Sequence, residues 1–419
     1  MARGIDTKCI HLEEDKGQCS HYGALSYPIY QTATYAHPGV GQSTGFDYSR
    51  LQNPTREHLE KMVAALENGI DAFALSSGMA AISLLMEMFR QGDHIIADSD
   101  LYGGSIRLFH NVNEKNGVEF SSIDCCRDDV ESYVKENTKA IYIETPTNPM
   151  MNVTDIRKMA DIAKRHNLIL IVDNTFATPI LCRPFEFGAD IVIHSTTKYM
   201  DGHATQLGGV IVDSGKFDWM AHADKYPGLC TPDESYHGVT YAEKFGNEGA
   251  FITKCTTQLM RDLGCIQSPQ NAFLLNLGLE TLPLRVERHC YNAQRIAEFL
   301  NAHEKVSHVN YAGLPDDKYY ALAQKYMNEG RTCGVISFEL TGGREAAVRF
   351  MDSLKLATIA THVAASKTMI LHPASHTHRQ MNDEQLAEAG VSPGMIRLSV
   401  GIENVEDIIA DIEQALKNA

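Results

Sequence analysis

The segment Ile191-Val192-Ile193-His194-Ser195-Thr196-Thr197-Lys198-Tyr199-Met200-Asp201-Gly202-His203 joins an apolar strand to a run of hydroxyl residues and a single lysine. A partly desolvated, partly neutral lysine amine attacks an aldehyde carbon to form a Schiff base, and a solvated lysine would not need a buried strand to present it. The hydroxyls of Ser195 and Thr197 would bind a phosphate on the same ligand. Pyridoxal phosphate (PLP) carries both an aldehyde and a phosphate. Taken alone, the segment is equally consistent with a polar loop after a strand.

Composition limits the class of protein. The 419 residues are too many for one ordinary core, so two or more domains are expected. A net charge of −16 argues against nucleic acid and anionic membrane surfaces as partners. No apolar run approaches the roughly 20 residues that span a bilayer. The start, Met1-Ala2-Arg3-Gly4-Ile5-Asp6-Thr7, lacks the apolar core of a signal peptide, so we expect a cytoplasmic enzyme.

The ten cysteines are scattered, and none forms a C-x-x-C pair or a Cys/His zinc spacing. We therefore expect reduced thiols in a reducing compartment and no metal site. A catalytic role is open for any one of them and favoured for none. They are Cys9, Cys19, Cys125, Cys126, Cys182, Cys230, Cys255, Cys265, Cys290 and Cys333.

Short apolar runs alternate with amphipathic helical segments from residue 53 to residue 213. This alternation predicts an α/β fold, with a mostly parallel sheet covered by helices on both faces. Ligands bind at the carboxyl ends of the strands in such sheets. The expected strands are Ala72–Leu75, His94–Ala97, Ala140–Ile143, Leu168–Val172, Asp190–Ile193 and Gly208–Val212, and the expected helices are 53–69, Met79–Arg90, Tyr102–Asn113 and Asp155–His166.

The pattern divides the chain into three parts. Residues 1–52 are aromatic without a helical or strand period, so we expect an N-terminal arm on a neighbouring subunit; an irregular lead-in is the alternative. Residues 53–282 form the expected large domain, and residues 283–419 a smaller C-terminal α+β domain. Within the large domain, residues 214–250 are expected to be an irregular insertion over a site rather than core. A helical region from about 249 to 300 follows, broken near Ser268-Pro269.

Two more strand ends carry residues suited to the same ligand. Ser76-Ser77-Gly78-Met79 leads into a helix, where backbone N–H groups favour an anion; a plain turn with a serine cap is the alternative. Asp173 directly follows an apolar strand, and a buried carboxylate needs a partner. The protonated pyridine nitrogen of PLP would be that partner. A loop cap or a metal ligand are the alternatives for Asp173.

Together, Ser77, Asp173 and Lys198 resemble the fold-type I PLP enzymes, with the last two 198 − 173 = 25 positions apart. More narrowly, the whole chain resembles the cysteine/methionine-metabolism family of cystathionine synthases, γ-lyases and O-acetylhomoserine sulfhydrylases. The motifs that carry this resemblance are Tyr48-Ser49-Arg50, Ser76-Ser77-Gly78-Met79, Tyr102-Gly103-Gly104, Glu144-Thr145-Pro146-Thr147-Asn148-Pro149, Val172-Asp173-Asn174-Thr175, His194-Ser195-Thr196-Thr197-Lys198-Tyr199, His372-Pro373-Ala374-Ser375 and Arg397-Leu398-Ser399-Val400-Gly401.

The resemblance implies a PLP-dependent transferase with a mostly parallel seven-stranded sheet, assembled as a tetramer of two catalytic dimers. In this family pattern, Lys198 forms the Schiff base and then moves protons, Asp173 pairs with the ring nitrogen, and Tyr102 stacks on the ring. Arg397 would bind the carboxylate of a small amino-acid substrate. The implied cofactor-binding residues are Tyr48, Arg50, Ser77, Gly78, Met79, Tyr102, Asn148, Asp173, Thr175, Ser195, Thr197 and Lys198, and the implied substrate-binding residues are Arg397, Asn148 and His362. Tyr48 and Arg50 would reach the phosphate of the adjacent subunit.

Two features bear on the branch of the family. The segment Pro232-Asp233-Glu234-Ser235-Tyr236-His237-Gly238 and the later Met260-Arg261-Asp262-Leu263-Gly264 resemble the O-acetylhomoserine sulfhydrylases. Gly104 stands where methionine γ-lyases carry a cysteine. The resemblance thus implies γ-replacement, in which O-acetyl-L-homoserine and sulfide or a thiol give homocysteine or methionine and acetate. A methionine or cystathionine γ-lyase, a cystathionine γ-synthase and a PLP-binding regulator without catalysis are the alternatives.

One segment departs from the family pattern. Where relatives carry Asn-Val-Gly-Asp or Ser-Leu-Gly-Asp, this chain has His362-Val363-Ala364-Ala365. Loss of the glycine and the aspartate would reshape the substrate end of the site, or it is drift in a loop whose backbone alone makes the contact.

Overall fold

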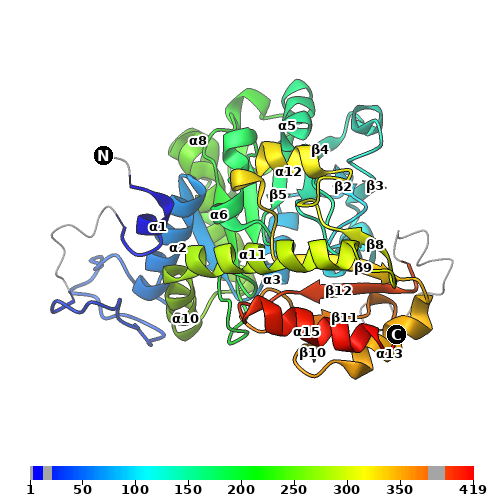
Figure 1. Cartoon of the computed structure of the whole chain (residues 1–419). Coiled ribbons are helices and arrows are strands. Elements are labelled where there is room, and N and C mark those ends of the chain that lie inside the picture. Colours follow the sequence, from blue (N-terminus) through cyan, green and yellow to red (C-terminus); the bar gives the residue numbers. More distant parts are fainter. Residues whose placement is uncertain (1–2, 13–20, 376–391) are drawn as a thin grey trace.

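The computed structural model describes residues 3–12, 21–375 and 392–419 (Figure 1). Its first sheet has seven strands in the order β1-β7-β6-β5-β4-β2-β3. Strands β2 to β6 pair in parallel, whereas β7 runs antiparallel to both β1 and β6. The strands are β1 (Asp71–Leu75), β2 (His94–Asp98), β3 (Glu119–Ile123), β4 (Thr138–Glu144), β5 (Ile169–Asp173), β6 (Ile191–His194) and β7 (Gly209–Asp213). The predicted mostly parallel seven-stranded sheet is confirmed.

Helices cover both faces of this sheet because the side chains of each strand alternate between two apolar clusters. Leu170 and Val172 of β5 face the cluster that holds α2, α5, α6, α10 and the start of α11. Ile169 and Ile171 face the cluster that holds α3, α7 and α8. The helices are α1 (Ile5–Lys8), α2 (Pro54–Glu67), α3 (Gly78–Met86), α4 (Gly103–Leu108), α5 (Ile156–Arg165), α6 (Thr178–Leu181), α7 (Pro227–Cys230), α8 (Tyr241–Lys254), α9 (Arg261–Leu263), α10 (Pro269–Glu280) and α11 (Leu282–Asn301).

A second sheet of five strands lies in the C-terminal part, in the order β10-β11-β12-β9-β8, and only its β10–β11 pair is parallel. Its elements are β8 (Val306–Asn310), α12 (Tyr320–Tyr326), β9 (Val335–Leu340), α13 (Gly343–Ser353), β10 (Thr358–Ile359), β11 (Met369–Leu371), β12 (Met395–Ser399) and α15 (Val405–Leu416). An α+β character of this part was predicted. The exact domain boundary at 282/283 stays a prediction.

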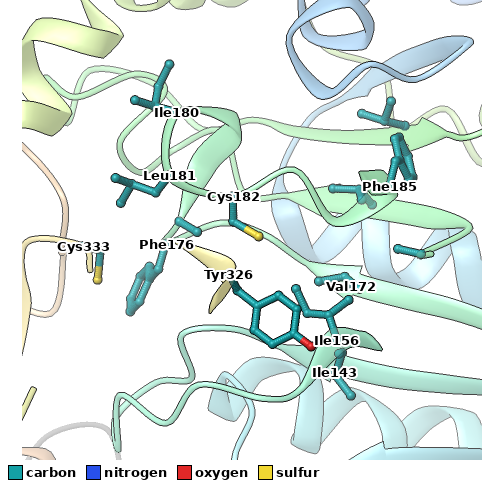
Figure 2. Packing of buried hydrophobic residues seen from close by; sticks show 14 of the residues in the cluster. Ile143, Ile156, Val172, Phe176, Ile180, Leu181, Cys182, Phe185, Tyr326 and Cys333 are labelled. Atoms are coloured by element: carbon teal, nitrogen blue, oxygen red, sulfur yellow. The ribbon is translucent and has the colours of Figure 1, made fainter. Parts of the chain in front are cut away.

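The two parts share a core. Helix α11 begins in the large-sheet cluster with Leu282 and Val286 and ends in the C-terminal cluster with Ile296 and Leu300. Figure 2 shows Tyr326, from beyond α11, beside Val172 of β5 in that first cluster, and Cys333 of the same cluster farther away, on the side of Phe176. The C-terminal part is therefore anchored close to the strand ends that carry the predicted site.

Residues 214–250 correct one prediction. Trp219 and Tyr226 are buried in the cluster on one face of the large sheet, so part of this segment belongs to the core, whereas residues 231–238 are partly or fully exposed. Helix α8 begins at Tyr241, before the expected start near Gly249, and Gly246 interrupts it with φ 67°. Gly246 and Gly249 interrupt the helical pattern of the sequence, so the periodicity did not predict the start of this helix at Tyr241.

Strand β3 was also missed. Its sequence, Glu119-Phe120-Ser121-Ser122-Ile123, lies at the edge of the sheet and is half exposed, so it lacks the apolar run by which the other strands were recognised.

Nine of the ten cysteines lie in the described part of the chain and all nine are free thiols, whereas Cys19 lies outside it. No helix within the described ranges is long and apolar enough to cross a membrane.

Candidate active site

Three neighbouring parallel strands end at the same edge of the large sheet. Glu144 ends β4, Asp173 ends β5 and His194 ends β6, with Glu144 paired to Asp173 and Asp173 to Ile193. Lys198 follows in the turn after β6. The fold thus brings the predicted aspartate and lysine to one edge.

Lys198 sits in a turn that is fixed from both sides. Its N–H donates to the Ser195 carbonyl at 3.2 Å, and its carbonyl accepts from Gly202 N at 2.8 Å. The buried Arg285 donates to the carbonyls of Tyr199 at 2.7 Å and Met200 at 3.3 Å. Burial, with a contribution from the charge of Arg397, lowers the pKa of Lys198 to about 8. The amine is therefore neutral often enough to act as a nucleophile or base near neutral pH.

Asp173 is 6% exposed, and burial raises the pKa of its carboxyl group. Oδ1 accepts from Thr175 N at 3.1 Å and from Thr175 Oγ1 at 2.5 Å. Thr175 Oγ1 also accepts from Ser195 N at 2.8 Å. Thr175 thereby links the carboxylate to the segment that leads into the Lys198 turn.

The turn before α3 packs directly against Ser195. Ser77 caps the helix, and its Oγ accepts from Ala80 N at 3.0 Å. A Cβ at Gly78 would lie 2.7 Å from Ser195 Cβ, so only glycine allows this close approach. The first amide groups of α3 have no partner within the helix and are suited to an anion. Thr197 Oγ1 accepts from Gly208 N at 3.0 Å and donates to Gly208 O at 3.3 Å, so its hydroxyl is already engaged.

Tyr102 lies beside the end of β4, where its N–H donates to Glu144 Oε2 at 2.8 Å. The side chain is 43% exposed in this single chain. A Cβ at Gly104 would lie 2.9 Å from Met79 Sδ and 3.0 Å from Tyr102 Cδ1. A cysteine at position 104 would therefore displace the Tyr102 ring or Met79.

Arg397 and Asn148 meet as the sequence predicts for a substrate end of the site. Arg397 donates from Nη1 to Asn148 Oδ1 at 3.1 Å and from Nη2 to the Thr361 carbonyl at 3.1 Å. Its Nε is buried and has no partner among the described residues. Burial lowers the pKa of Arg397 to about 10, and the guanidinium remains charged at neutral pH.

The segment 362–365 keeps the backbone shape that glycine favours. Ala364 is buried with φ 65°, and its N–H donates to Ser399 Oγ at 2.7 Å. Burial first, and then the charge of Lys198, lower the pKa of His362 to about 4, so His362 is neutral at neutral pH. Its Nε2 is buried and has no partner within the described ranges. The loop therefore presents a neutral imidazole near Lys198 and Arg397.

Tyr48 and Arg50 are arranged differently. The Arg50 guanidinium lies 5.3 Å from the centre of the Tyr48 ring, and Arg50 Nη1 donates to the carbonyl of Arg261. Among the described residues, no hydrogen bond or ion pair joins either side chain to Lys198 or Asp173.

Sequence reasoning gave no role to a buried cluster behind the strand ends. Glu67, at the end of α2, accepts from His194 Nε2 at 2.5 Å and from Asn174 Nδ2 at 2.8 Å. His194 and Asn174 lie inside quoted motifs, but the carboxylate comes from 127 residues before His194. The one sequence signal for this cluster was the position of Glu67, a charged residue among the apolar residues of α2.

These residues fit PLP. The start of α3 can pack against Ser195 because residue 78 is glycine, Asp173 offers a buried carboxylate, and Lys198 offers an amine whose pKa is about 8. No group of three or more His, Cys, Asp or Glu side chains that would hold a metal ion occurs in the described part of the chain. The arrangement is that expected of a PLP-dependent enzyme.

Comparison with known proteins identifies the family. Residues 6–417 match the family described as Cys/Met metabolism PLP-dependent enzyme. The chain is 42% identical to the O-acetyl-L-homoserine sulfhydrylase of Leptospira meyeri, over 100% of this chain and 98% of that one. It is also 42% identical to the cystathionine gamma-lyase of Bacillus subtilis, over 94% of this chain and 95% of that one. The chain therefore belongs to the Cys/Met metabolism family of PLP-dependent enzymes.

A solved structure from Campylobacter jejuni that carries a pyridoxyl-lysine monophosphate has a TM-score of 0.93 to this chain at 36% identity, covering 99% of this chain and 100% of that one. PLP is thus the cofactor of this enzyme, and its fold is that of the family.

Proposed function

We propose that the enzyme catalyses γ-replacement, in which O-acetyl-L-homoserine and sulfide, or a thiol, give homocysteine, or methionine, and acetate. The Cγ–O bond breaks, acetate leaves, and a Cγ–S bond forms. The observation that carries the proposal is the amine of Lys198, with a pKa near 8, beside the buried guanidinium of Arg397. The relative named O-acetyl-L-homoserine sulfhydrylase, similar over the full chain, supports the choice of substrates.

The cofactor contacts follow from the edge of the sheet. When bound, PLP supplies an aldehyde for the amine and a ring that withdraws electrons from the substrate's α-carbon. Asp173 would face the ring nitrogen, and Thr175 holds its carboxylate in place. Tyr102 would lie on the ring. Lys198 would bond the aldehyde and then, once released, accept and return protons at the substrate carbons.

The phosphate would lie at the start of α3. Ser77 caps α3 and Gly78 packs against Ser195, so the first amides of α3 and the Ser195 hydroxyl lie close together and would donate to the phosphate. Thr197 would bind the phosphate through its backbone N–H, or through its hydroxyl if the hydrogen bond between that hydroxyl and Gly208 is broken.

The substrate carboxylate would bind Arg397. Asn148 and the Thr361 carbonyl fix the guanidinium, while Nε is a buried donor with no partner in the described part of the chain. A buried unpartnered donor costs free energy unless a ligand satisfies it. Asn148 would also meet the cofactor's phenolic oxygen, and His362 would face the substrate from the adjoining loop.

A γ-lyase is the second candidate, because the Bacillus subtilis cystathionine gamma-lyase is as similar as the sulfhydrylase is. The two activities share their steps up to loss of the γ-substituent and differ in whether sulfur or water then reacts. A cysteine at position 104, as in methionine γ-lyases, would displace the Tyr102 ring or Met79, so the packing disfavours a methionine γ-lyase and does not bear on a cystathionine γ-lyase.

We place this enzyme in the cytoplasm as a homo-oligomer, built as a tetramer of two catalytic dimers. The exposed apolar side chains of Tyr22, Leu25 and Val40 in the arm support an intersubunit role for residues 21–52. Tyr48 and Arg50 would then reach the phosphate in the neighbouring subunit.

Product analysis tests the activity. The purified, PLP-loaded protein would be given O-acetylhomoserine with and without sulfide, and methionine and cystathionine in parallel. We expect homocysteine and acetate only when both O-acetylhomoserine and sulfide are present. Rapid formation of a 2-oxo acid from methionine or cystathionine, with no homocysteine from O-acetylhomoserine, would contradict γ-replacement.

A further inference from the structure

A polar cluster lies buried on the face of the large sheet opposite to Asp173. Glu67 and His194 are 0% and 1% exposed, and Glu67 Oε1 accepts from His194 Nε2 at 2.5 Å. The same oxygen accepts from Asn174 Nδ2 at 2.8 Å. Asn174 Nδ2 also donates to the Cys182 carbonyl at 2.8 Å. One carboxylate from α2 thus contacts the ends of both β5 and β6.

This arrangement works against the stability of the fold. A carboxylate in the last turn of a helix lies at the negative end of the helix dipole. Its burial costs further free energy, which a partner must offset. Glu67 Oε2 and His194 Nδ1 are both buried without a partner in the described part of the chain. An apolar pair would serve packing alone better, so a functional reason for these residues is called for.

The cluster is electrostatically close to Asp173. Side chains alternate along a strand, so Asp173 and His194 project to opposite faces of neighbouring strands, one residue out of register. On its own side, Asp173 faces the Tyr142 hydroxyl and the carboxyl group of Glu144, and Thr175 donates to it. Burial raises the pKa of Asp173, and the two hydrogen bonds from Thr175, followed by the charge of His194, oppose this rise.

We propose that Glu67 and His194 are positioning residues: they form a buried ion pair behind the sheet, with the imidazole one residue out of register with Asp173 on the neighbouring strand, and this pair favours the ionised carboxylate of Asp173 for the ring nitrogen of PLP. This inference rests on the cofactor contact proposed above for Asp173. Neither residue touches the cofactor; each acts through Asp173 and through the strand ends that Glu67 and Asn174 hold together.

Glu67→Gln is the first test, because glutamine keeps the hydrogen bonds and removes the charge. The readout is the ratio of dissociation constants of the apoprotein for PLP and for its analogue with carbon in place of the ring nitrogen. We expect the preference for PLP to fall about tenfold, the order of magnitude for removal of a charge close to a buried carboxylate. We expect kcat to fall similarly, with KM for the amino acid unchanged.

His194→Gln and the double variant separate charge from structure. His194→Gln leaves the Glu67 charge buried and unpaired, so this variant is expected to be the least stable of the set. The double variant is neutral, so stability should recover while the preference for PLP stays as low as in Glu67→Gln. If the single variants fail to fold, the double variant alone carries the test. Asp411→Asn, at another buried carboxylate that accepts three backbone N–H groups, is the matched control.

Asp173→Asn separates the two proposals. If this variant keeps the wild-type preference for PLP over the analogue, the contact of Asp173 with the ring nitrogen is wrong. If Asp173→Asn loses the preference while Glu67→Gln and the double variant keep it, only the present inference fails. An equal loss of the preference for PLP in Asp411→Asn would mean that any buried carboxylate has this effect, and the present inference would be wrong. Recovery of both the preference and the stability in the double variant would show that Glu67 and His194 have only a structural role, and would also contradict the inference.

Discussion

The edge of the large sheet and the N-terminal arm, which we propose to meet across a subunit interface, are built in different ways. At the edge, Asp173, Thr175 and Ser195 are joined by hydrogen bonds within the chain, and Arg397 is fixed by Asn148. In the arm, Arg50 donates a hydrogen bond to the Arg261 carbonyl, and the apolar side chains of Leu25 and Val40 are exposed. The contacts at the edge form within a single chain, whereas the role proposed for the arm requires a second copy.

The edge supplies the largest expected effect. Lys198→Ala should lower the rate of γ-replacement by about 10³-fold or more, because one amine both binds the cofactor and transfers protons. Removing a buried amine should not lower the melting temperature. Steady-state kinetics and a thermal melt check both statements, and a variant that keeps full activity would refute the assignment of Lys198.

Arg397→Lys should raise KM for the amino acid about 10- to 100-fold, with PLP still bound. A lysine has one nitrogen and cannot contact Asn148, Thr361 and a carboxylate in the same geometry. Titration of the variant with substrate and with PLP separates the two effects. An unchanged KM would mean that the carboxylate binds elsewhere.

The lowered pKa of Lys198, at this edge, should appear in the pH dependence of the rate of PLP binding. Because burial lowers the pKa of Lys198 to about 8, the neutral amine becomes more abundant as pH rises and levels off above that value. The rate of PLP binding to apoprotein should thus rise about tenfold per pH unit below pH 8. Stopped-flow absorbance measures this rate. A plateau reached only near the pKa of an exposed lysine would contradict the described burial.

The arm is tested by mixing two inactive variants. If Arg50 serves the site of a neighbour, Lys198→Ala and Arg50→Ala subunits should together regain about a quarter of wild-type activity, because half of random dimers are mixed and each holds one intact site. The mixture would be unfolded and refolded together, with each variant refolded alone as the control. No recovery in proven mixed dimers would place Arg50 in its own subunit's site.

The smallest effect is expected at Ala364. Glycine would relieve the left-handed conformation but remove a buried methyl group, so stability should change by about 1 kcal/mol or less. KM should stay the same because the backbone already has the required shape. A tenfold change in KM would show that the segment 362–365 alters substrate choice.

What the sequence could predict differs between the two halves. Asp173 was found because it follows the apolar residues of one buried strand, and Lys198 because it lies four residues past the end of another; parallel strands end at one edge. The polar edge strand β3 and the glycine-rich start of α8 gave no such pattern. Glu67 escaped because its partner lies 127 residues away, and hydrogen bonds between distant segments leave no local pattern.

For the N-terminal arm, the prediction was limited by the absence of a second copy of the chain. Its aromatic composition predicted a surface to cover, yet neither the sequence nor a single folded chain contains the neighbouring copy that Tyr48 and Arg50 would meet. The motif Tyr48-Ser49-Arg50 was recognised only through resemblance to the family.

The most direct test of the account is to locate the cofactor on the chain. Borohydride would reduce the bond between PLP and the protein, and peptide mass spectrometry would then identify the modified residue. We expect the pyridoxyl phosphate on Lys198, with no modification in the Lys198→Ala variant. Modification of another lysine, or none in fully active protein, would contradict the site described at the strand ends.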